Sequence, residues 1–406
     1  MKEYRLGDII DIKHGYAFDG DHIVQEDNGI VLVTPGNFRI GGGFQEEKCK
    51  FFTGEIPSDY VLSSGDFIVT MTDLSKEIDT LGYSAIVPTS NRTYLHNQRI
   101  GLVSFKNNEC YPGYIYFLMR THRYQRSIAN TSTGATVHHT SPSKICDYQF
   151  FAPSYEEQQR IAEYLFAYET LIENNQKQNK LLEEAAQRLY KEWFVDLRFP
   201  SYETTPIVDG IPEGWRKGKI SDFVPTSSGG TPSRTHSEYY SDGTNLWVKT
   251  QELNDGFIFD TEEKITDDAI RNSSAKIIPQ GSILMAMYGA TIGKIGIAAT
   301  ELTCNQACCV FNLSKIKYAT SYLYCWLKDN REFFISQGKG AAQPNLSQAM
   351  IKNFDVLIPT ADILTTFSQV TDTLLELSAK LHLQNRGLIE SRDRLLPKLM
   401  SGEIEV

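Results

Sequence analysis

The chain repeats itself, and this repetition limits its possible folds more than any other feature of the sequence. Short segments of the first half recur in the same order about 210 residues later. The matched pairs are Leu6-Gly-Asp-Ile-Ile with Ile220-Ser-Asp-Phe-Val, Val33-Thr-Pro with Val248-Lys-Thr, Glu46-Glu-Lys with Glu262-Glu-Lys, 64–71 with 280–287, Asn97-Gln98 with Asn305-Gln306, and 134–153 with 340–359. Each match is short, but this many in one order are not expected by chance. We therefore predict two domains of one fold that differ in their loops.

Each half mixes short strands with helices, which predicts an α+β fold. The predicted strands cover 30–33, 67–71 and 100–105 in the first half, and 246–248, 283–287 and 307–312 in the second. A helix is predicted near 114–126 and near 320–336. The two globular domains would span residues 1–152 and 201–358.

A long helix is predicted after each globular domain, over 153–200 and 359–406. Residues 154–195 contain no Gly or Pro, and Ser154 with Glu157 forms a capping box. Large or apolar residues then recur in alternating steps of three and four, as in a coiled-coil seam. The seam residues are Ile161, Leu165, Tyr168, Ile172, Leu182, Ala186, Leu189 and Trp193 in the first helix, and Phe367, Val370, Leu374, Leu377, Leu381, Gln384, Leu388, Ser391, Leu395 and Leu399 in the second.

Each of these seams needs a partner, and the two helices match each other. The first helix must carry the chain to the second domain, and the second has the length to return. We therefore predict an antiparallel coiled-coil spacer, about 60 Å long for ~40 residues, in a nearly circular chain with approximate two-fold symmetry. Asn175, Asn179 and Gln384 interrupt the seams, either as loosely packed positions or as buried amides that fix the register.

Charge and cysteine usage restrict the partners and the compartment. A net charge of −10 argues against a nucleic-acid partner, although residues 92–126 are locally basic, as either a phosphate-facing surface or a solvated helix face. The basic residues there are Arg92, Arg99, Lys106, Arg120, Arg123 and Arg126, and the acidic one is Glu109. No apolar run reaches the roughly 18 residues of a membrane span, and the 7 cysteines follow no regular framework, so we expect a cytoplasmic protein. We interpret Cys304, Cys308 and Cys309 as buried strand residues and expect no metal site.

Four segments resemble signature segments of the specificity subunits of type I restriction-modification systems. They are Leu189-Tyr-Lys-Glu-Trp-Phe-Val-Asp-Leu-Arg-Phe-Pro200, Leu395-Leu-Pro-Lys-Leu-Met-Ser-Gly-Glu-Ile404, Ile211-Pro-Glu-Gly-Trp215 and Tyr288-Gly-Ala-Thr-Ile-Gly-Lys294. The resemblance covers the whole chain in order. The first half departs from it, because Met71-Thr-Asp-Leu-Ser-Lys-Glu stands where the second half has the segment that begins at Tyr288.

The resemblance implies that 1–152 and 201–358 are target recognition domains, each reading one half of a bipartite target in double-stranded DNA. The helices would be the central and C-terminal conserved regions and would dock two methyltransferase (M) subunits. Restriction/translocase (R) subunits would join that core. S-adenosylmethionine, ATP and Mg are then expected on the partner subunits, with no cofactor on this chain.

The sequence lacks the motifs that such chemistry would need, so we expect a non-catalytic chain. It contains no Pro-Pro pair for an amino-methyltransferase motif and no Phe-x-Gly-x-Gly. The glycines of 289–294 are spaced wrongly for a phosphate loop. The nuclease-like Glu-x-Lys at Glu262 recurs at Glu46, and in both places we interpret it as surface charge.

Base contacts are made by Arg, Lys, Asn and Gln, while Ser, Thr, Tyr and His add phosphate contacts. On this basis we select loop residues of each domain as candidate DNA contacts, the alternative for each being ordinary solvation or a strand-end hydrogen bond. In the first domain they are His14, Tyr16, Arg39, Thr72, Lys76, Gln98, Arg99, His138 and His139. In the second they are Ser228, Arg234, Lys249, Gln251, Tyr288, Thr291, Lys294, Gln306, Lys339 and Gln343.

Three other interpretations remain open at this stage. The chain could serve a related type IIB-like or methylation-only complex, which differs only in its partners. It could instead be a coiled-coil interaction adaptor with two protein-binding domains, which would explain its acidity better. An enzyme with an unrecognised site is the third.

Overall fold

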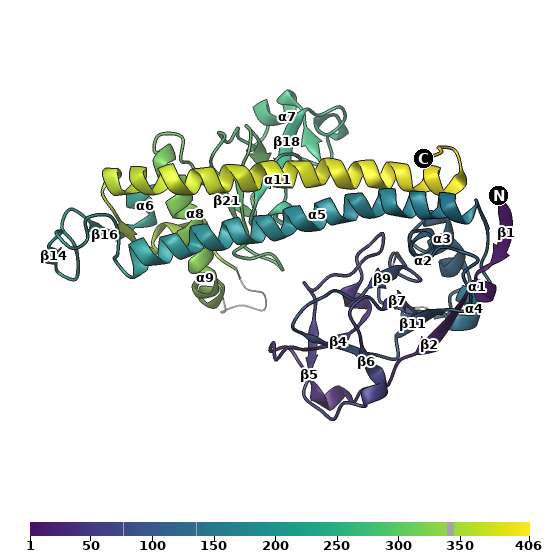
Figure 1. Ribbon diagram of the computed structural model, residues 1–406. Coiled ribbons are helices and arrows are strands. Elements are labelled where there is room, and N and C mark those ends of the chain that lie inside the picture. Colours follow the sequence, from purple (N-terminus) through teal and green to yellow (C-terminus); the bar gives the residue numbers. More distant parts are fainter. Residues whose placement is uncertain (76, 135, 339–344) are drawn as a thin grey trace. The chain divides into compact units, whose positions relative to one another are not determined.

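Two long helices each follow a globular domain along the chain: α5 (Tyr155–Tyr190) and α11 (Ala361–Ser401). The computed structural model describes residues 1–75, 77–134, 136–338 and 345–406. It divides into two compact units, Met1–Ile172 with Leu388–Val406, and Glu173–Gly387. Each unit therefore contains one globular domain together with part of each long helix, and the α+β prediction is confirmed (Figure 1).

Domain one of unit 1 is built on a four-stranded sheet of order β2-β11-β7-β9 and a five-stranded sheet of order β3-β5-β4-β10-β6. The strands are β1 (Lys2–Arg5), β2 (Ile10–His14), β3 (Ile23–Val24), β4 (Ile30–Val33), β5 (Lys50–Phe52), β6 (Val61–Leu62), β7 (Phe67–Thr70), β8 (Thr72–Asp73), β9 (Ser84–Ile86), β10 (Thr93–His96), β11 (Ile100–Phe105), β12 (His138–His139) and β13 (Gln149–Ala152). The short helices are α1 (Leu6–Ile9), α2 (Pro112–Leu118), α3 (His122–Asn130) and α4 (Pro142–Cys146).

Domain two of unit 2 has a five-stranded sheet of order β17-β24-β21-β22-β19 and a three-stranded sheet of order β20-β18-β23. Its strands are β14 (Ile207–Val208), β15 (Ile211–Pro212), β16 (Arg216–Lys219), β17 (Thr226–Ser228), β18 (Asn245–Val248), β19 (Phe257–Ile258), β20 (Lys264–Ile265), β21 (Ile283–Ala286), β22 (Ile295–Ala298), β23 (Thr303–Cys304), β24 (Cys308–Phe311) and β25 (Asp355–Ile358). Its helices are α6 (Ile220–Phe223), α7 (Asp267–Arg271), α8 (Thr320–Asp329), α9 (Arg331–Gln337) and α10 (Gln348–Lys352).

The two domains share the fold that the repeat predicted. The order β2-β11-β7-β9 of the first domain corresponds to β17-β24-β21-β22 of the second, and the pair β1-β13 corresponds to β16-β25. The predicted strands 30–33 and 100–105 coincide with β4 and β11, and the other four agree within a residue at each end. Each predicted domain helix, however, is broken into two, α2 with α3 and α8 with α9. In domain one the break follows from Thr121, whose hydroxyl accepts the N–H of Tyr124 and starts a new helix.

The long helices run antiparallel, as predicted. In unit 2, Trp193 of α5 packs on Phe367 of α11 with ring centroids 5.5 Å apart, whereas Asn175, further back along α5, meets Asn385, further along α11. In unit 1, Glu169 of α5 bonds Arg392. Of the predicted seam residues, Ile161, Leu165, Ile172, Phe367 and Leu381 are buried, and Leu182, Leu189, Leu374, Leu388 and Leu395 are half-buried.

Four predicted seam positions of α11 are wrong. Val370 and Leu377 are 49% and 44% exposed, and Gln384 and Ser391 are exposed as well. Beside the first three of these, the buried positions are the neighbours Thr371, Ser378 and Asn385. Small side chains let the helices approach closely, and the Thr371 hydroxyl is satisfied inside its own helix by donating to the Phe367 carbonyl oxygen at 2.8 Å.

The buried amides in the seam differ in their bonding. Asn175 donates from Nδ2 to Oδ1 of Asn385 at 2.9 Å and to Oε1 of Gln384 at 3.3 Å. One turn along α5, Asn179 is 4% exposed, and neither of its side-chain polar atoms has a hydrogen-bond partner among the described residues. One turn back along α11 from Asn385 stands Leu381, which is apolar. The interpretation as register-fixing amides therefore suits Asn175 and not Asn179.

Substitution of the two asparagines should change stability in opposite directions. Asn175→Leu removes a buried hydrogen bond to Asn385 and a partly buried one to Gln384, and it should lower the free energy of unfolding by about 1–3 kcal/mol. Asn179→Leu replaces an unbonded buried amide with an apolar group and should raise it by about 1 kcal/mol. Urea unfolding of both variants measures this. Equal destabilisation by the two substitutions would contradict the assignment.

Candidate nucleic-acid interface

Four chain segments meet at one edge of domain one: the end of β2, the turn between β10 and β11, β8 and β12. Backbone hydrogen bonds hold them together. In each bond the backbone N–H of the first residue donates to the carbonyl oxygen of the second. The pairs are Tyr16 with His96 (2.8 Å), Gln98 with Tyr16 (2.9 Å), Met71 with Arg99 (2.9 Å) and Thr140 with Met71 (3.0 Å). Segments distant in sequence therefore present their side chains from a common scaffold, which we call the reading edge.

Several predicted contact residues stand on the reading edge of domain one. His14, Gln98 and Arg99 are exposed, and Tyr16 is 43% exposed. The turn that carries Gln98 and Arg99 is fixed from inside, because Oδ1 of the buried Asn97 accepts the N–H of Arg99 at 3.0 Å. These side chains can offer amide and guanidinium donors for base edges.

A glycine lies at the centre of each edge. A Cβ on Gly15 would stand 2.1 Å from the carbonyl oxygen of Asn97, and one on Gly229 would stand 2.1 Å from that of Cys304. Two backbones approach each other too closely at these positions for any side chain. Gly15 and Gly229 each lie nine residues after the start of the matched segments at Leu6 and Ile220, and this close packing explains the glycine at both positions.

The pair β8–β12 adds histidines to the edge. His139 is exposed, and its Nδ1 lies 3.1 Å from the hydroxyl of Thr72, which is 2% exposed. Thr72 was selected as a contact, but burial leaves it the role of orienting His139. His138 is half-buried beside it. Lys76 lies outside the described residues.

Domain two repeats three of these four backbone bonds. The equivalent backbone bonds run from the N–H of Gly230 to the O of Cys304 (2.9 Å), Met287 to Ala307 (2.9 Å) and Leu346 to Met287 (2.7 Å). The side chain of Asn305 takes the place of Asn97 and accepts the N–H of Ala307 at 3.1 Å. Both domains thus build the same edge and differ in the side chains on it.

The side chains on the second edge are Ser228, Tyr288 and Gln306. Tyr288 is 37% exposed and forms a β-bridge with Asn345, as Thr72 pairs with His139 in domain one. Gln306 is exposed, and its Oε1 accepts the hydroxyl of Thr231. Ser228 is half-buried at the end of β17. Ala307 takes the position on this edge that Arg99 has in domain one.

Other selected cations of domain two are already engaged by carboxylates. Arg234 bonds Glu263 at 2.6 Å, and its guanidinium lies 4.1 Å from the centroid of the Tyr240 ring. Lys249 and Gln251 both donate to Glu262, at 2.7 and 3.2 Å. The acidic pair that resembled a nuclease motif therefore holds these side chains in place. The structure gives them a bracing role within the domain.

The remaining selected residues are less informative. Arg39 is half-buried in a turn closed by its own N–H and the Gly43 carbonyl oxygen, at 3.0 Å. Thr291 is half-buried in the turn before Lys294. Lys339 and Gln343 lie outside the described residues.

The basic run 92–126 does not form one surface. Arg92 pairs with Asp27 at 2.5 Å and Glu46 at 3.2 Å, and Arg120 is 4% exposed and bonded to Glu169. Neither interpretation of the run, a phosphate-facing surface or a solvated helix face, fits these two arginines.

The sequence-based selection missed two residues of the reading edge of domain one, Tyr60 and Lys13. The ring of Tyr60 lies 5.3 Å from that of Tyr16, and Nζ of Lys13 lies 4.8 Å above the Tyr60 ring. Lys13 is exposed one residue before His14, so it supplies a cation beside the selected residues. The adjacent Lys13-His14 pair was the only signal in the sequence, because Tyr60 reaches the edge from a distant segment.

In domain two an ion cluster holds the loop that follows β21. Arg331, at the start of α9, donates to both carboxylate oxygens of Asp255, and its Nη1 lies 2.9 Å from Oδ2. Its Nε donates to the Gly293 carbonyl oxygen at 3.0 Å. Lys294 lies 3.2 Å from the same carboxylate. Burial by itself would raise the pKa of Asp255, but hydrogen bonding and charge from Arg331, the Ile295 N–H and Lys294 together lower it. The cluster therefore positions the turn that ends at Lys294.

Because the folded pKa of Asp255 is lowered, the stabilisation it gives should be present above the pKa of an unfolded aspartate, near 3.9, and be lost as the pH falls through the lower folded pKa. Asp255→Asn keeps a residue that tolerates the positive φ of 62°. We expect it to cost about 2 kcal/mol at pH 7, with the difference from the unsubstituted protein shrinking below about pH 4. Denaturant unfolding over a pH series measures this. A difference that is constant with pH would contradict the role of the charge.

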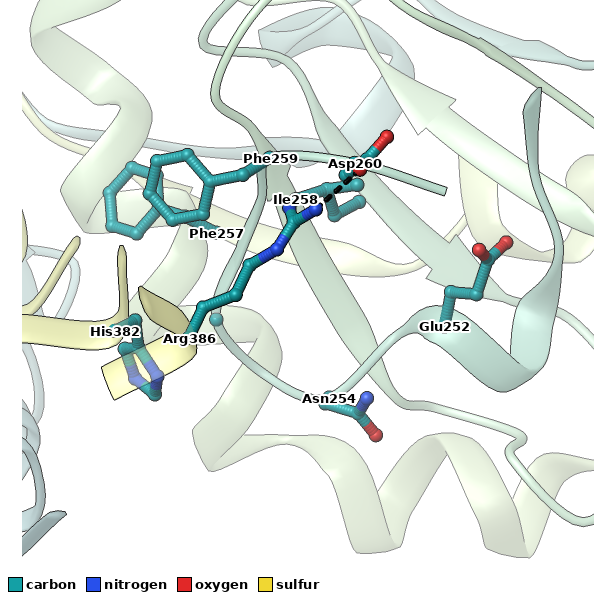
Figure 2. Close-up of a pocket in the computed structure, with 9 residues that line it drawn as sticks. Glu252, Asn254, Phe257, Ile258, Phe259, Asp260, His382 and Arg386 are labelled. Carbon is teal, nitrogen blue, oxygen red and sulfur yellow. Dashed lines mark hydrogen bonds and ion pairs between the residues drawn. The ribbon is translucent and has the colours of Figure 1, made fainter. Parts of the chain in front are cut away.

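A cavity of about 280 Å³ lies between the β19 segment of domain two and α11. Figure 2 shows Arg386 reaching from α11 to Asp260, beside the rings of Phe257 and Phe259. Nη2 of Arg386 lies 2.5 Å from Oδ2 of Asp260, and this hydrogen bond lowers the pKa of Asp260. The guanidinium is thus neutralised by a carboxylate, so the cavity lacks the free cation that an anion site needs. We interpret the pair as a tie between the domain and the helix.

Within the described ranges, no group of three or more His, Cys, Asp or Glu side chains could hold a metal ion. Cys304, Cys308 and Cys309 are buried in β23 and β24, as the sequence predicted. Among the helices formed by the described residues, none combines the length and hydropathy needed to cross a bilayer.

Comparison with known proteins identifies relatives over most of the chain. A family model described as the type I restriction modification DNA specificity domain matches residues 1–184 and again 212–384. The type I restriction enzyme MjaIX specificity subunit of Methanocaldococcus jannaschii is 28% identical over 301 residues, covering 72% of this chain and 69% of that protein. The HindI specificity subunit of Haemophilus influenzae is 23% identical over 404 residues, covering 79% and 86%.

A solved structure shares the fold. The crystal structure of the type-I restriction-modification system S subunit from M. genitalium superposes with a TM-score of 0.59 and 14% identity, over 98% of this chain and 95% of that one. Two copies of the family model, together covering most of the sequence, agree with the two equivalent domains. The chain therefore belongs to the specificity subunits of type I restriction-modification systems, whose role is DNA recognition.

Proposed function

We propose that each globular domain reads one half of a bipartite target in double-stranded DNA through its reading edge, while α5 and α11 set the distance between the halves. The observation that carries this is the repeated scaffold with unlike side chains: histidines, Gln98 and Arg99 on one edge, Tyr288 and Gln306 on the other. One scaffold with two side-chain sets suits two different half-sites. Readout would use base edges in the major groove, where the base pairs can be told apart.

The chain would work without catalysis of its own. Methyltransferase subunits docked on the helices would bring S-adenosylmethionine, and restriction/translocase subunits would bring ATP and Mg. The type IIB-like and methylation-only alternatives keep the same reading role and change only these partners. The acidity that favoured a protein-interaction adaptor is accounted for in part by carboxylates that engage cations within the chain, such as Glu263 with Arg234.

The decisive experiment maps methylated bases in a host genome that carries this chain with its methyltransferase subunit. We expect methylation at an asymmetric bipartite motif, two short sequences separated by a fixed number of unread bases. Cells that carry the methyltransferase alone provide the control. Methylation at one continuous motif would contradict two-domain reading, and the same pattern without this chain would contradict its role in recognition.

A further inference from the structure

The turn that carries Gln306 is held by one backbone bond fewer than its counterpart in domain one. There the N–H of Gln98 donates to the Tyr16 carbonyl oxygen at 2.9 Å. The corresponding carbonyl in domain two belongs to Gly230, and it accepts the indole N–H of Trp247 at 3.0 Å. Among the described residues, no carbonyl oxygen accepts the N–H of Gln306. The second reading edge therefore lacks one of the bonds that fix the first.

This difference has its origin in a single residue of β18. Trp247 is 2% exposed and precedes Val248, which the repeat matches with Val33 of domain one. In each domain this valine pairs with the residue just before the asparagine of the turn. The residue before Val33 is Leu32, whose side chain has no N–H, whereas a buried indole N–H needs a partner. In domain two the indole therefore bonds the carbonyl oxygen that the turn bonds in domain one.

Thr231 restrains the same turn through its side chain. Its hydroxyl donates to Oε1 of Gln306. The corresponding residue of domain one is Ala17, because each follows the matched glycine of its domain by two residues. Alanine has no hydroxyl to offer to Gln98. The two domains thus hold equivalent glutamines by different means, one through its backbone and the other through its side chain.

Thr231 can act as a support because both of its neighbours in the chain are fixed. Gly230 forms hydrogen bonds through its N–H and through its carbonyl oxygen. Pro232 is buried, and its carbonyl oxygen accepts the hydroxyl of Tyr240 at 2.6 Å. The proline ring also restricts the residue before it to extended backbone conformations. Thr231 itself is exposed, so its hydroxyl meets Gln306 at the surface of the domain.

We propose that Thr231 is a positioning residue for DNA recognition by domain two, and that it determines how sharply Gln306 discriminates between bases. This rests on the proposed function, which assigns base reading to the edge. A free glutamine side chain loses conformational freedom when it binds, whereas one that is already held has less to lose. The bond turns Oε1 toward Thr231, so Nε2 is the group that can donate to acceptor atoms of a base edge. Thr231 acts through Gln306 and needs no contact with DNA.

The test measures binding of the chain, in complex with its methyltransferase subunit, to its target and to single-base variants of that target. Thr231→Val nearly keeps the shape of the side chain and removes the hydroxyl. Discrimination at the base that Gln306 reads should fall about three- to ten-fold, as expected for the loss of one hydrogen bond. Thr231→Ser keeps the hydroxyl and should keep most of the discrimination.

The matched control is Thr235→Val. Thr235 is an exposed threonine of the same loop, and its hydroxyl lies 2.8 Å from that of Ser233. Its substitution should leave base preference unchanged. Thermal unfolding verifies that every variant folds.

A double substitution decides whether Thr231 acts through Gln306. Once Gln306→Ala has removed the amide, Thr231→Val should have no further effect on base preference, because the two residues act as one unit. Additive effects, or a loss at a different base, would mean that Thr231 touches DNA itself. A uniform loss at every base would point to a phosphate contact. Each of these results overturns the positioning role.

Failure of this proposal differs from failure of the function on which it rests. If neither substitution changes base preference, or only Gln306→Ala does, Thr231 has no part in positioning and the proposed function stands. If the unsubstituted complex binds every single-base variant of the half-site assigned to domain two equally well, that domain does not read bases, and the proposed function is contradicted.

Discussion

Replacing Glu169 with alanine should destabilise unit 1 by about 3–5 kcal/mol, because the buried guanidinium of Arg120 would lose its carboxylate, whereas Arg392 keeps its pairing with Asp393. Oε1 of Glu169 lies 2.5 Å from Nη1 of Arg392 and 3.3 Å from Nη2 of Arg120. The Arg120 side chain is only 2% exposed, and the other two are 14–15% exposed. An unpaired charge that cannot reach water is among the largest single defects a substitution can create.

Arg120 also ties domain one to α5 in a way that water cannot replace. Its Nε donates to the Gly41 carbonyl oxygen at 2.8 Å and its Nη1 to the Tyr116 hydroxyl at 3.0 Å. The three groups therefore join the domain to both long helices. Denaturant unfolding of Glu169→Ala, followed by circular dichroism, measures the cost.

An exposed ion pair on α11, the helix that carries Arg392, provides the control. Arg394 and Glu390 lie 2.6 Å apart with side chains 77% and 55% exposed, so Glu390→Ala should cost less than about 0.5 kcal/mol. Burial would raise the pKa of Glu169, but the charges and hydrogen bonds of Arg120 and Arg392 lower it overall. Its stabilisation should therefore be present above the pKa of an unfolded glutamate, near 4.3, and be lost on acidification below it. Equal effects of the two substitutions at pH 7 would show that the buried triad is not structurally important.

The architecture could be predicted from the sequence because it rests on local patterns and on repetition. Strand periodicity located β4 and β11 to the residue, and the glycine pair Gly15 and Gly229 marked the same close backbone contact in both domains. The heptad pattern predicted that the two long helices pair, and the order of the domains along the chain predicted that they run antiparallel. These features can be predicted because they depend on the spacing of side chains along the chain, which can be read directly from the sequence.

The details of the seam could not be predicted, because hydrophobicity alone does not decide which residue is buried between close helices. Leu377 was preferred over Ser378, yet the serine is 4% exposed and the leucine 44%. Where two helices approach closely, a small side chain fits and a leucine does not. That depends on interhelical distance, which the sequence does not display.

The sequence could predict which site residues are exposed where a turn presents them. It could not predict which side chains form ion pairs with residues far away in the sequence. Gln98 and Arg99 follow directly from the turn between β10 and β11. Arg234 and Lys249 were equally good candidates for DNA contacts by residue type, but carboxylates on a neighbouring loop bind them. Tertiary ion pairing of this kind links residues whose separation in sequence carries no signal.

The last prediction concerns DNA recognition: substituting Arg99 and Gln306 should relax different halves of the target. Arg99→Ala removes the one arginine exposed on the edge of domain one, and arginine is the usual bidentate reader of guanine. We expect a loss of about 1–3 kcal/mol at one base of one half-site, with the other half unaffected. Gln306→Ala, on the equivalent turn of domain two, should do the same to the opposite half.

Binding of each variant in complex with the methyltransferase to single-base target variants measures both effects. Arg234→Ala is the matched control, because Glu263 already engages that guanidinium and its loss should leave base preference unchanged. Since the two edges share one scaffold but not their side chains, the changes must fall on separate halves if each domain reads its own. Relaxation of the same half by both substitutions, or a uniform loss at every base, would mean that these turns touch only the phosphate backbone or do not touch DNA at all.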